Sequence, residues 1–151
     1  GFEISAFYMP TDWLTIDVDY ALARARFSDS DPSGDHIPGS IKGAGKLAIS
    51  VDNIGAFFGS MQWRYFGKRS LTTDNSVQSN YTLTLNGQIG YKIGKNVQIS
   101  LQGFNLLNTR AHAIDYFYTS RLPGEPAAGV SDLHFHPIES RSFRVNLVAN
   151  Y

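Results

Sequence analysis

Apolar and polar residues alternate along much of the chain, most regularly at its C-terminal end. Phe143, Val145, Leu147, Ala149 and Tyr151 take every second position, and the positions between them are mostly polar. A period of two places all the apolar side chains on one face of an extended strand. The pattern therefore predicts a strand that reaches the last residue with one apolar and one polar face. A wall between lipid and water is built from such strands.

Six more segments alternate in the same way and are predicted as strands: 1–9, 13–27, 41–51, 56–68, 80–93 and 97–107. Several exceed ten residues, whereas strands of globular proteins average about five or six. About nine to eleven residues cross a bilayer at a tilt. Polar side chains of these segments are expected to face a lumen, where hydrogen bonds satisfy them. They include Asp17, Asp19, Arg64, Gln88, Gln102 and Arg144.

The connections between the predicted strands alternate in length. Three are short turns, at 10–12, 52–55 and 94–96. Three are long loops, at 28–40, 69–78 and 108–138. Outer-membrane barrels have short periplasmic turns and longer extracellular loops. The sequence thus predicts an all-β fold, an antiparallel transmembrane β-barrel segment of about seven strands, with its C-terminus on the short-turn, periplasmic side.

Aromatic residues gather near both ends of the predicted strands, and Trp and Tyr favour the interface between acyl chains and water. Those at the short-turn ends are Tyr8, Trp13, Phe57, Tyr91 and Tyr151, and those toward the long loops are Phe27, Trp63, Tyr65 and Tyr81. Arg24, Arg26 and Arg141 continue apolar faces at their outer ends. Two interpretations stand for these arginines. They bind lipopolysaccharide phosphates through bidentate guanidinium contacts, or they are ordinary rim charges.

The composition excludes several other kinds of protein. The 151 residues include 13 basic and 13 acidic side chains, so there is no electrostatic case for nucleic-acid binding. The absence of cysteine excludes disulfides, zinc–thiolate sites and a cysteine nucleophile. No segment approaches the roughly 18–20 apolar residues of a transmembrane helix. The length suits one domain of ordinary size.

Four segments resemble the C-terminal part of TonB-dependent outer-membrane receptors. The most specific are 103–108, Gly-Phe-Asn-Leu-Leu-Asn, similar to the family's Asn-Leu-hydrophobic-Asn/Asp signature near the end of the penultimate strand, and the last strand, 141–151. The others are 1–14, similar to a hairpin with the pattern G-x-E … Y-x-P … W-L, and the Ile-Pro-Gly at 37–39. Together their order and spacing cover nearly the whole chain.

This resemblance implies part of a 22-stranded barrel closed by an N-terminal plug domain. Such receptors import scarce ligands, such as iron–siderophore complexes, haem, cobalamin or saccharides, with energy from the TonB–ExbB–ExbD complex. We expect no catalytic residue and no cofactor. Seven strands cannot close a bacterial barrel, which uses even numbers from eight upward. Residues 1–151 are therefore expected to be the C-terminal third of a receptor, without the plug, the TonB box and the earlier strands.

The resemblance also implies a role for the last strand in assembly. It is similar to the signal that the barrel assembly machinery reads, carried here by Phe143, Val145, Leu147 and Tyr151. In an intact receptor this strand pairs with the first barrel strand. The implied location is the outer membrane of a Gram-negative bacterium, in contact with the bilayer, lipopolysaccharide, the plug and the remaining strands.

The longest loop holds the candidate ligand-binding residues: Arg110, His112, Tyr116, Tyr118, Arg121, His134 and His136. Aromatic and cationic side chains bind flat or anionic ligands by stacking and charge. Loops on a rigid wall often carry binding. The alternative is that the aromatic residues pack on one another to close a long loop.

The histidines of this loop also have two interpretations. His134 and His136 fall on one side of an extended segment, where they form half of a metal site. Alternatively they are scattered, solvated side chains. No third ligand has a diagnostic spacing, so we predict no metal site.

Two other classes of protein compete with the receptor. One is a different outer-membrane barrel, either a porin-like channel or a barrel enzyme, for which Ser120 and His112 are conceivable but unoriented as nucleophile and base. The other is a soluble β-sandwich binding module, against which the long strands argue. No Ser/His/Asp set has the spacing of a known catalytic motif.

Overall fold

The computed structural model describes residues 1–29 and 31–150, and the regular structure in them is β-strand. No helix in these residues is long and apolar enough to cross a membrane. The strands are β1 (Phe2–Thr11), β2 (Leu14–Leu22), β3 (Gly43–Ile54), β4 (Phe57–Phe66), β5 (Thr82–Ile93), β6 (Val97–Phe104), β7 (His112–Ser120), β8 (Val130–Pro137) and β9 (Ser142–Ala149).

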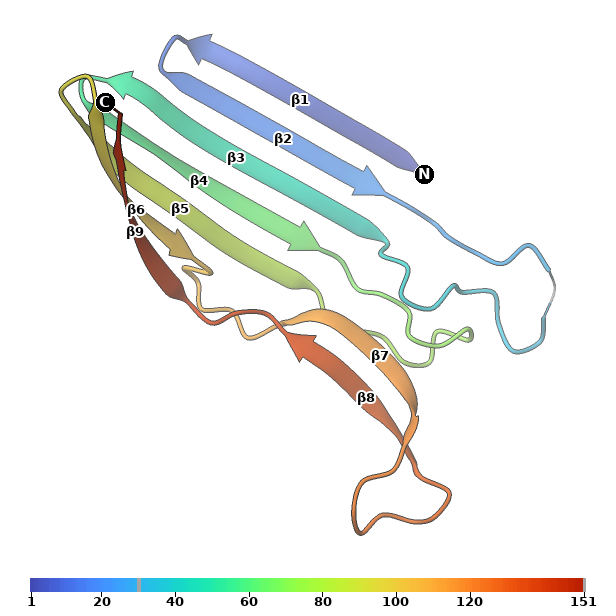
Figure 1. Cartoon of the computed structure of the whole chain (residues 1–151). Coiled ribbons are helices and arrows are strands. Elements are labelled where there is room, and N and C mark those ends of the chain that lie inside the picture. The colour runs from blue at the N-terminus through green and yellow to red at the C-terminus, as the bar shows by residue number, and fades with distance from the viewer. Residues whose placement is uncertain (30, 151) are drawn as a thin grey trace.

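Seven of these strands form one antiparallel sheet in the order β1-β2-β3-β4-β5-β6-β9. Neighbours in the sheet are consecutive in the chain, except that the β7–β8 hairpin lies between β6 and β9. Figure 1 shows a single curved layer that stays open, with β1 and β9 at its edges. The predicted wall of seven antiparallel strands is therefore confirmed.

The register of the strand pairs aligns the apolar positions of the seven strands on one face. One row joins Gly59 of β4, Ile89 of β5, Leu101 of β6 and Val145 of β9 as direct partners. Direct partners in an antiparallel pair point to the same side of the sheet. Alternation therefore gives the whole sheet one apolar face, which we call the apolar wall.

Almost nothing covers the apolar wall. Ile89 is 60% exposed and Val145 is 68% exposed. Within the described residues, Leu71 and Leu85 are the only buried hydrophobic side chains. A β-sandwich buries the inner faces of two packed sheets, and these residues form a single layer instead. The fold is therefore not the soluble sandwich that the sequence left open.

The opposite face is polar and makes its own hydrogen bonds. Lys46 Nζ lies 2.8 Å from Asp17 Oδ2 and 2.7 Å from Asp19 Oδ2. Gln102 Nε2 donates to Gln88 Oε1 at 3.1 Å. The register places all the polar residues predicted to share a lumen-facing side on this face: Asp17, Asp19, Arg64, Gln88, Gln102 and Arg144.

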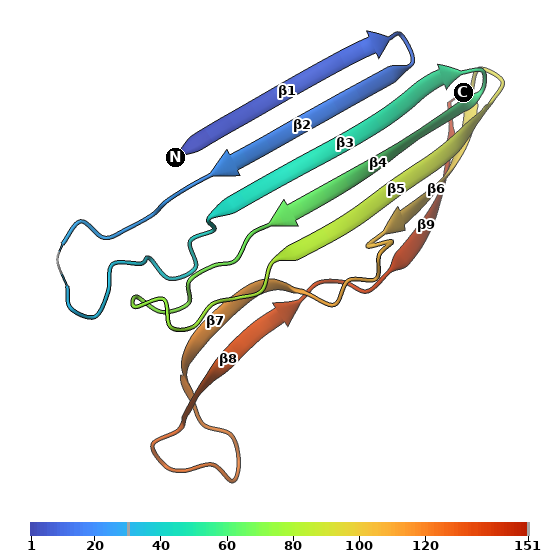
Figure 2. The same ribbon diagram turned by 180° about the vertical axis from the view of Figure 1, so that it is seen from behind.

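Short and long connections lie at opposite ends of the sheet, as predicted. In Figure 2 the three tight turns meet at one end, and the segments 23–42, 67–81 and 105–141 leave from the other. The amide of Asn150 donates to the carbonyl of Asn96 in the β5–β6 turn at 2.8 Å. The end of β9 therefore lies on the short-turn side.

Four strands end earlier than the alternation predicts, and one of them is β4, which stops at Phe66 rather than at position 68. β2 stops at Leu22 rather than at position 27, and the chain then turns into loop contacts. β6 stops at Phe104 rather than at 107, because Asn105 has φ of 47°, a left-handed conformation that ends the ladder. β9 ends at Ala149, so the prediction that the last strand runs to the final residue is not supported, and Tyr151 itself lies outside the described residues.

The longest connection contains a hairpin that the sequence interpretation missed. β7 and β8 pair with each other in an antiparallel ladder. His112 is opposite Pro137 at one end of the ladder, and Ser120 is opposite Val130 at the other end. The prediction of one loop over 108–138 is therefore wrong. Aromatic residues stand at three consecutive positions, Tyr116, Phe117 and Tyr118. Both faces of the strand then carry apolar groups, and the two-residue period disappears.

Candidate functional site

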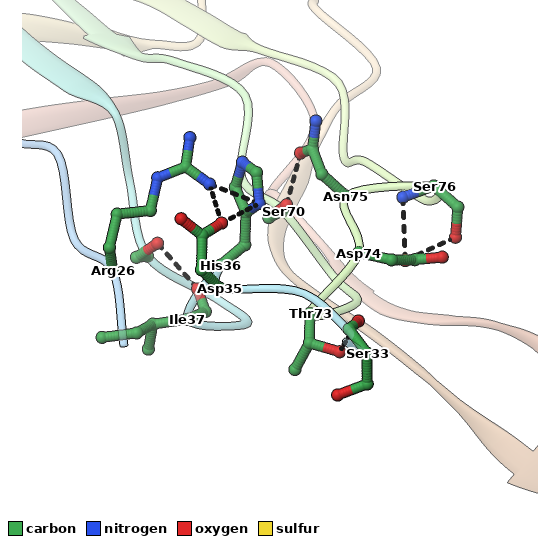
Figure 3. A network of polar contacts seen from close by, with 11 residues as sticks. Arg26, Ser33, Asp35, His36, Ile37, Ser70, Thr73, Asp74, Asn75 and Ser76 are labelled. Carbon is green, nitrogen blue, oxygen red and sulfur yellow. Dashed lines mark hydrogen bonds and ion pairs between the residues drawn. The ribbon is translucent and has the colours of Figure 1, made fainter. Parts of the chain in front are cut away.

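The long connections form the candidate functional site, and two of them are joined into one block. The amide of His36 donates to Thr73 O at 3.0 Å, and that of Gly39 donates to Ser70 O at 2.8 Å. Thr73 Oγ1 donates to Ser33 O at 2.9 Å, a contact visible in Figure 3. We call the segments 23–42 and 67–81 the loop block, because backbone and side-chain bonds fix each to the other.

Arg26 is held inside the loop block by polar partners. Its Nη1 donates to Asp35 Oδ1 at 2.6 Å and to His36 Nδ1 at 2.5 Å, as Figure 3 shows. His36 Nδ1 also lies 3.3 Å from Asp35 Oδ1, so the three side chains form one cluster. Arg26 is therefore part of a structural ion pair that orders the loop.

A tight turn at 72–76 closes one side of the loop block. Asp74 Oδ1 accepts from the amide of Ser76 at 3.0 Å and from its hydroxyl at 2.8 Å. The Thr72 hydroxyl and these two donors lower the pKa of Asp74 to about 2. Since the pKa is lower in the folded state, this contribution to stability is full above pH 4 or so and is lost as the pH falls toward 2.

One buried ion pair attaches the β7–β8 hairpin to the loop block. Asp115, 3% exposed, accepts from Nη2 of Arg69, 6% exposed, at 3.2 Å. Nη1 of Arg69 donates to Ala113 O at 3.3 Å, and the second carboxylate oxygen of Asp115 hydrogen-bonds Nδ1 of His112. A buried carboxylate needs such partners. Thr82 at the start of β5 also donates through Oγ1 to the carbonyl of His112 at 3.0 Å, and beyond these contacts the hairpin projects past the end of β5, as Figure 1 shows.

The Asn-Leu-Leu-Asn element closes the base of the hairpin. Asn105 is 5% exposed, and its Nδ2 donates to the carbonyls of Thr109 at 3.0 Å and Glu139 at 2.9 Å. Its Oδ1 accepts from the amide of Thr109 at 3.0 Å. Asn108 Oδ1 accepts from the amide of Arg141 at 3.3 Å. These two side chains tie the segment leaving β6 to the segment entering β9.

Four of the seven predicted ligand residues share one face of the hairpin. Tyr116 is the direct partner of His134, and Tyr118 and His136 lie two positions along on the same side. The rings of Tyr118 and His134 stack with centroids 3.9 Å apart and planes 14° from parallel. Tyr116 and Tyr118 are exposed. We call these four residues the aromatic face.

The other three predicted ligand residues lie elsewhere. The His112 ring stacks on Phe135, with centroids 3.7 Å apart. Arg110 lines a hollow of about 400 Å³ beside this stack at the hairpin base. Arg121 follows β7, and its Nε donates to the carbonyl of Glu125 at 3.2 Å in the hairpin loop. The predicted ligand residues therefore lie at three places on the hairpin: its base with Arg110 and His112, the aromatic face, and its tip with Arg121. The sequence analysis had grouped them as one set.

The histidine positions bear on the two interpretations made from the sequence. His134 and His136 do share a side of β8, as an extended segment requires. Across residues 1–29 and 31–150, no group of three or more His, Asp or Glu side chains is placed to hold a metal ion. The His134 ring is instead packed on Tyr118, with its Nε2 buried and without a hydrogen-bond partner. Stacking is the role that both interpretations missed.

Sequence reasoning also missed the residues that anchor the hairpin. Arg69 and Asp115 are separated by 46 positions, so no local spacing joins them. The available signal was the single acid between Ile114 and Tyr116 in an otherwise apolar run, because a charge in such a place is usually paired.

The predicted assembly residues that the structure describes lie along the apolar wall. Phe143, Val145 and Leu147 of β9 are 63, 68 and 69% exposed. One edge of β9 is paired to β6, and the other edge has no strand beside it within the described residues. Tyr151, the fourth predicted residue, lies outside them.

Solved structures share this arrangement of strands and loops. The siderophore receptor PiuA from Acinetobacter baumannii aligns with 97% of the chain at a TM-score of 0.73 and 17% identity. The ferric-catecholate import receptor Fiu from Escherichia coli K12, in its closed form, aligns with 99% at 0.77 and 18%. The chain has the fold of part of an outer-membrane receptor barrel. The ferric yersiniabactin uptake receptor FyuA from Yersinia pestis aligns with 99% of the chain at a TM-score of 0.73 and 17% identity.

The chain is much shorter than these proteins. It spans 20% of PiuA, 20% of Fiu and 23% of FyuA, a smaller share than the third expected from the sequence. No protein-family model matches the chain, and no curated protein sequence matches it. The likeness therefore concerns the fold.

Gly34→Ala is expected to loosen the loop block, whereas Gly39→Ala keeps it intact. Both glycines have a positive φ, 113° and 82°, so both substitutions strain the backbone. A Cβ at Gly34 would lie 2.3 Å from the carbonyl oxygen of Thr73, and one at Gly39 would meet nothing within 4 Å. Hydrogen exchange at the amide of His36 should accelerate only in Gly34→Ala; equal exchange in both variants would contradict the packing.

Asp115→Ala is expected to release the hairpin from the loop block. The change leaves Arg69 buried without its carboxylate, which costs about 3–5 kcal/mol for a buried pair. Amide hydrogen exchange should rise throughout β7 and β8 and stay unchanged in β3. Asp132→Ala is the matched control, because Asp132 is an exposed acid that pairs with Tyr118 on the aromatic face, opposite the face that carries Asp115. Equal hydrogen exchange in β7 and β8 of the two variants would show that the Arg69–Asp115 pair does not anchor the hairpin.

Proposed function

We propose that this chain forms part of the wall and outer rim of an outer-membrane receptor that imports a ferric siderophore. One observation carries the proposal. A single-layer sheet with one exposed apolar face and one polar face aligns with siderophore receptors over 97–99% of its length. A sheet of this kind is stable where lipid covers one side and polar groups or water cover the other.

The membrane location follows from the apolar wall. Its large side chains are exposed over all seven strands, and lipid is the environment that removes this area from water. Aromatic residues border it at both ends, with Trp13 42% and Tyr81 57% exposed. We assign the chain to the outer membrane of a Gram-negative bacterium, with the long connections outside the cell.

The aromatic face is the proposed ligand contact, with Arg110 and His112 at the hairpin base as further contacts and Arg121 at its tip. Flat rings stack on aromatic platforms, and a guanidinium attracts an anionic chelate. A ferric complex of a catecholate, the ligand class in the name of Fiu, presents flat rings and negative charge together. This chemistry supports a siderophore better than a sugar.

The remaining parts of the receptor are proposed partners. The polar face of the sheet would contact a plug domain, and the edges of β1 and β9 would pair with further barrel strands. We take residues 1–151 as the C-terminal part of the barrel, by resemblance of 103–108 and 141–151 to the family signatures. Import would then draw on TonB–ExbB–ExbD, and the barrel assembly machinery would read β9.

A barrel enzyme is less well supported than a receptor. The conceivable pair, Ser120 and His112, sits at opposite ends of β7, about 26 Å apart along a strand. Asp115 does hold Nδ1 of His112, as an acid orients a catalytic histidine, but the ring is stacked on Phe135 and Ser120 is too distant to pass a proton to it. A porin-like channel differs from a receptor in needing no energy, so the uptake experiment below separates the two.

Ile89→Arg is expected to destabilise the intact protein in lipid vesicles by about 2–4 kcal/mol, the cost of a cation on the lipid face of a barrel. Gln88→Arg, the next residue on the polar face, is the matched control and should cost far less. Urea titration of the folded protein in vesicles measures both. Equal costs at the two positions would contradict the membrane orientation of the sheet.

Cells that lack their own siderophore receptors and carry the intact protein should accumulate radiolabelled iron from a ferric catecholate. Uptake should stop when TonB is deleted. Uptake that persists would indicate a channel, and no uptake of any ferric siderophore would contradict the proposed function.

Replacing Tyr116 and Tyr118 by Ala should weaken binding of the ferric catecholate roughly tenfold through lost stacking. Tyr8→Ala, the same change at the short-turn end, should leave binding unchanged.

A further inference from the structure

We propose that Arg64 and Phe66, on the polar face at the outer end of β4, form a second contact for a ferric chelate of net negative charge. Cζ of Arg64 lies 5.5 Å from the centroid of the Phe66 ring. Both residues stand in the last turn of alternation before β4 enters the long connection 67–81. The inference rests on the proposed function, and it adds a contact on the strands to those proposed on the hairpin.

The charge of Arg64 is not neutralised by its neighbours. Arg64 is exposed, and within residues 1–29 and 31–150 its guanidinium forms no ion pair. β4 is the middle strand of the seven, and the direct partners of Arg64 on its two sides are Lys46 and Thr84. Neither partner is acidic. The surroundings on both neighbouring strands therefore leave Arg64 with its positive charge.

The acids that share this face of the sheet belong to Lys46. Its Nζ lies 2.8 Å from Asp17 and 2.7 Å from Asp19, both on β2. Two strand spacings, about 10 Å together, separate β2 from β4. That distance exceeds the Debye length of about 8 Å at physiological salt. Asp17 and Asp19 therefore attract Arg64 only weakly, and an anion placed directly beside Arg64 meets little competition.

Phe66 orients the guanidinium and supplies a ring surface. A guanidinium is attracted to the face of an aromatic ring, while its N–H groups remain free to bind two oxygens in a fork. The Phe66 side chain is half-buried, so part of its ring stays open to a flat ligand. Catecholate oxygens on aromatic rings match both features, because they combine paired negative oxygens with flat groups.

The Arg64–Phe66 pair lies next to the base of the hairpin. Phe66 is the direct partner of Thr82 on β5, and Thr82 Oγ1 donates to the carbonyl of His112 at 3.0 Å. His112 also lines the hollow of about 400 Å³ at the hairpin base. A chelate that leaves the hairpin and moves inward along the polar face would therefore meet Phe66 and Arg64 first.

The test measures equilibrium binding of a ferric tris-catecholate complex to the intact protein in detergent, at low and at physiological salt. Arg64→Gln should weaken binding at low salt about tenfold, as expected for the loss of one hydrogen bond to a charged group. Binding to the unchanged protein should weaken as salt rises, because salt screens the attraction, and Arg64→Gln should reduce this dependence. Arg64→Lys keeps the charge and should retain most of it.

Lys92→Gln is the matched control. Lys92 is also a cation over a ring on the polar face, with Nζ 5.8 Å from the centroid of Phe58. It lies at the short-turn end, however, and its Nζ is paired with Asp52 at 2.7 Å. Lys92→Gln removes the same charge as Arg64→Gln, and it should bind the complex like the unchanged protein.

Three outcomes would overturn the inference and leave the proposed function standing. The first is unchanged binding in Arg64→Gln. The second is an equal loss in Lys92→Gln, which would indicate diffuse attraction. The third is weaker binding in Arg64→Gln with the same salt dependence as the unchanged protein, which would indicate a structural role for Arg64. Failure of the unchanged protein to bind any ferric catecholate would instead contradict the proposed ligand class, and this inference with it.

Discussion

Every strand of the seven-stranded sheet must keep its apolar side chains on the same side as those of its neighbours, and the rest of the structure depends on this register. A slip of one residue in any ladder would turn an entire strand over. Leu101, for instance, would then exchange faces with Gln102, placing an amide in the apolar wall. The tight turns at 12–13, 55–56 and 94–96 help to fix the register, because they leave little slack between paired strands.

The outer end of the molecule is stabilised in a different way from the wall. There the chain leaves the regular ladder, and backbone groups find partners one by one, as between His36 and Thr73. Ion pairs supplement these hydrogen bonds: Arg26 pairs with Asp35, and Arg69 pairs with Asp115. In the membrane location proposed above, lipid would stabilise the wall, whereas individual hydrogen bonds stabilise the loops.

The sequence was informative where structure is local and periodic. Alternation over 80–93 and 143–149 predicted both the strands and the face of each side chain, because a strand imposes a period of two whatever its partner. Turn residues predicted which connections are short. Strand ends were less predictable, since β6 stops where Asn105 adopts a left-handed conformation that the alternation of apolar and polar residues does not reveal.

Contacts between distant segments were beyond prediction from one sequence. Asn105 bonds to Glu139, and Arg69 to Asp115, across 34 and 46 positions, and nothing in local spacing selects those partners. The β7–β8 hairpin was not predicted for a different reason: the consecutive aromatic residues of β7 interrupt the alternation of apolar and polar positions. The candidate ligand residues were found by type, whereas their division among the base, the face and the tip depended on the pairing of β7 with β8.

The attachment of the hairpin has an evolutionary consequence. β7 and β8 pair only with each other among the described strands, and a few buried polar groups at Asn105 and Asp115 join them to the body. Insertion, shortening or replacement of residues within the β7–β8 hairpin would leave every strand pairing of the seven-stranded sheet unchanged. Sequence change in the hairpin is thereby uncoupled from selection on folding of the sheet, and the ligand contact proposed for it could change while the wall stays the same.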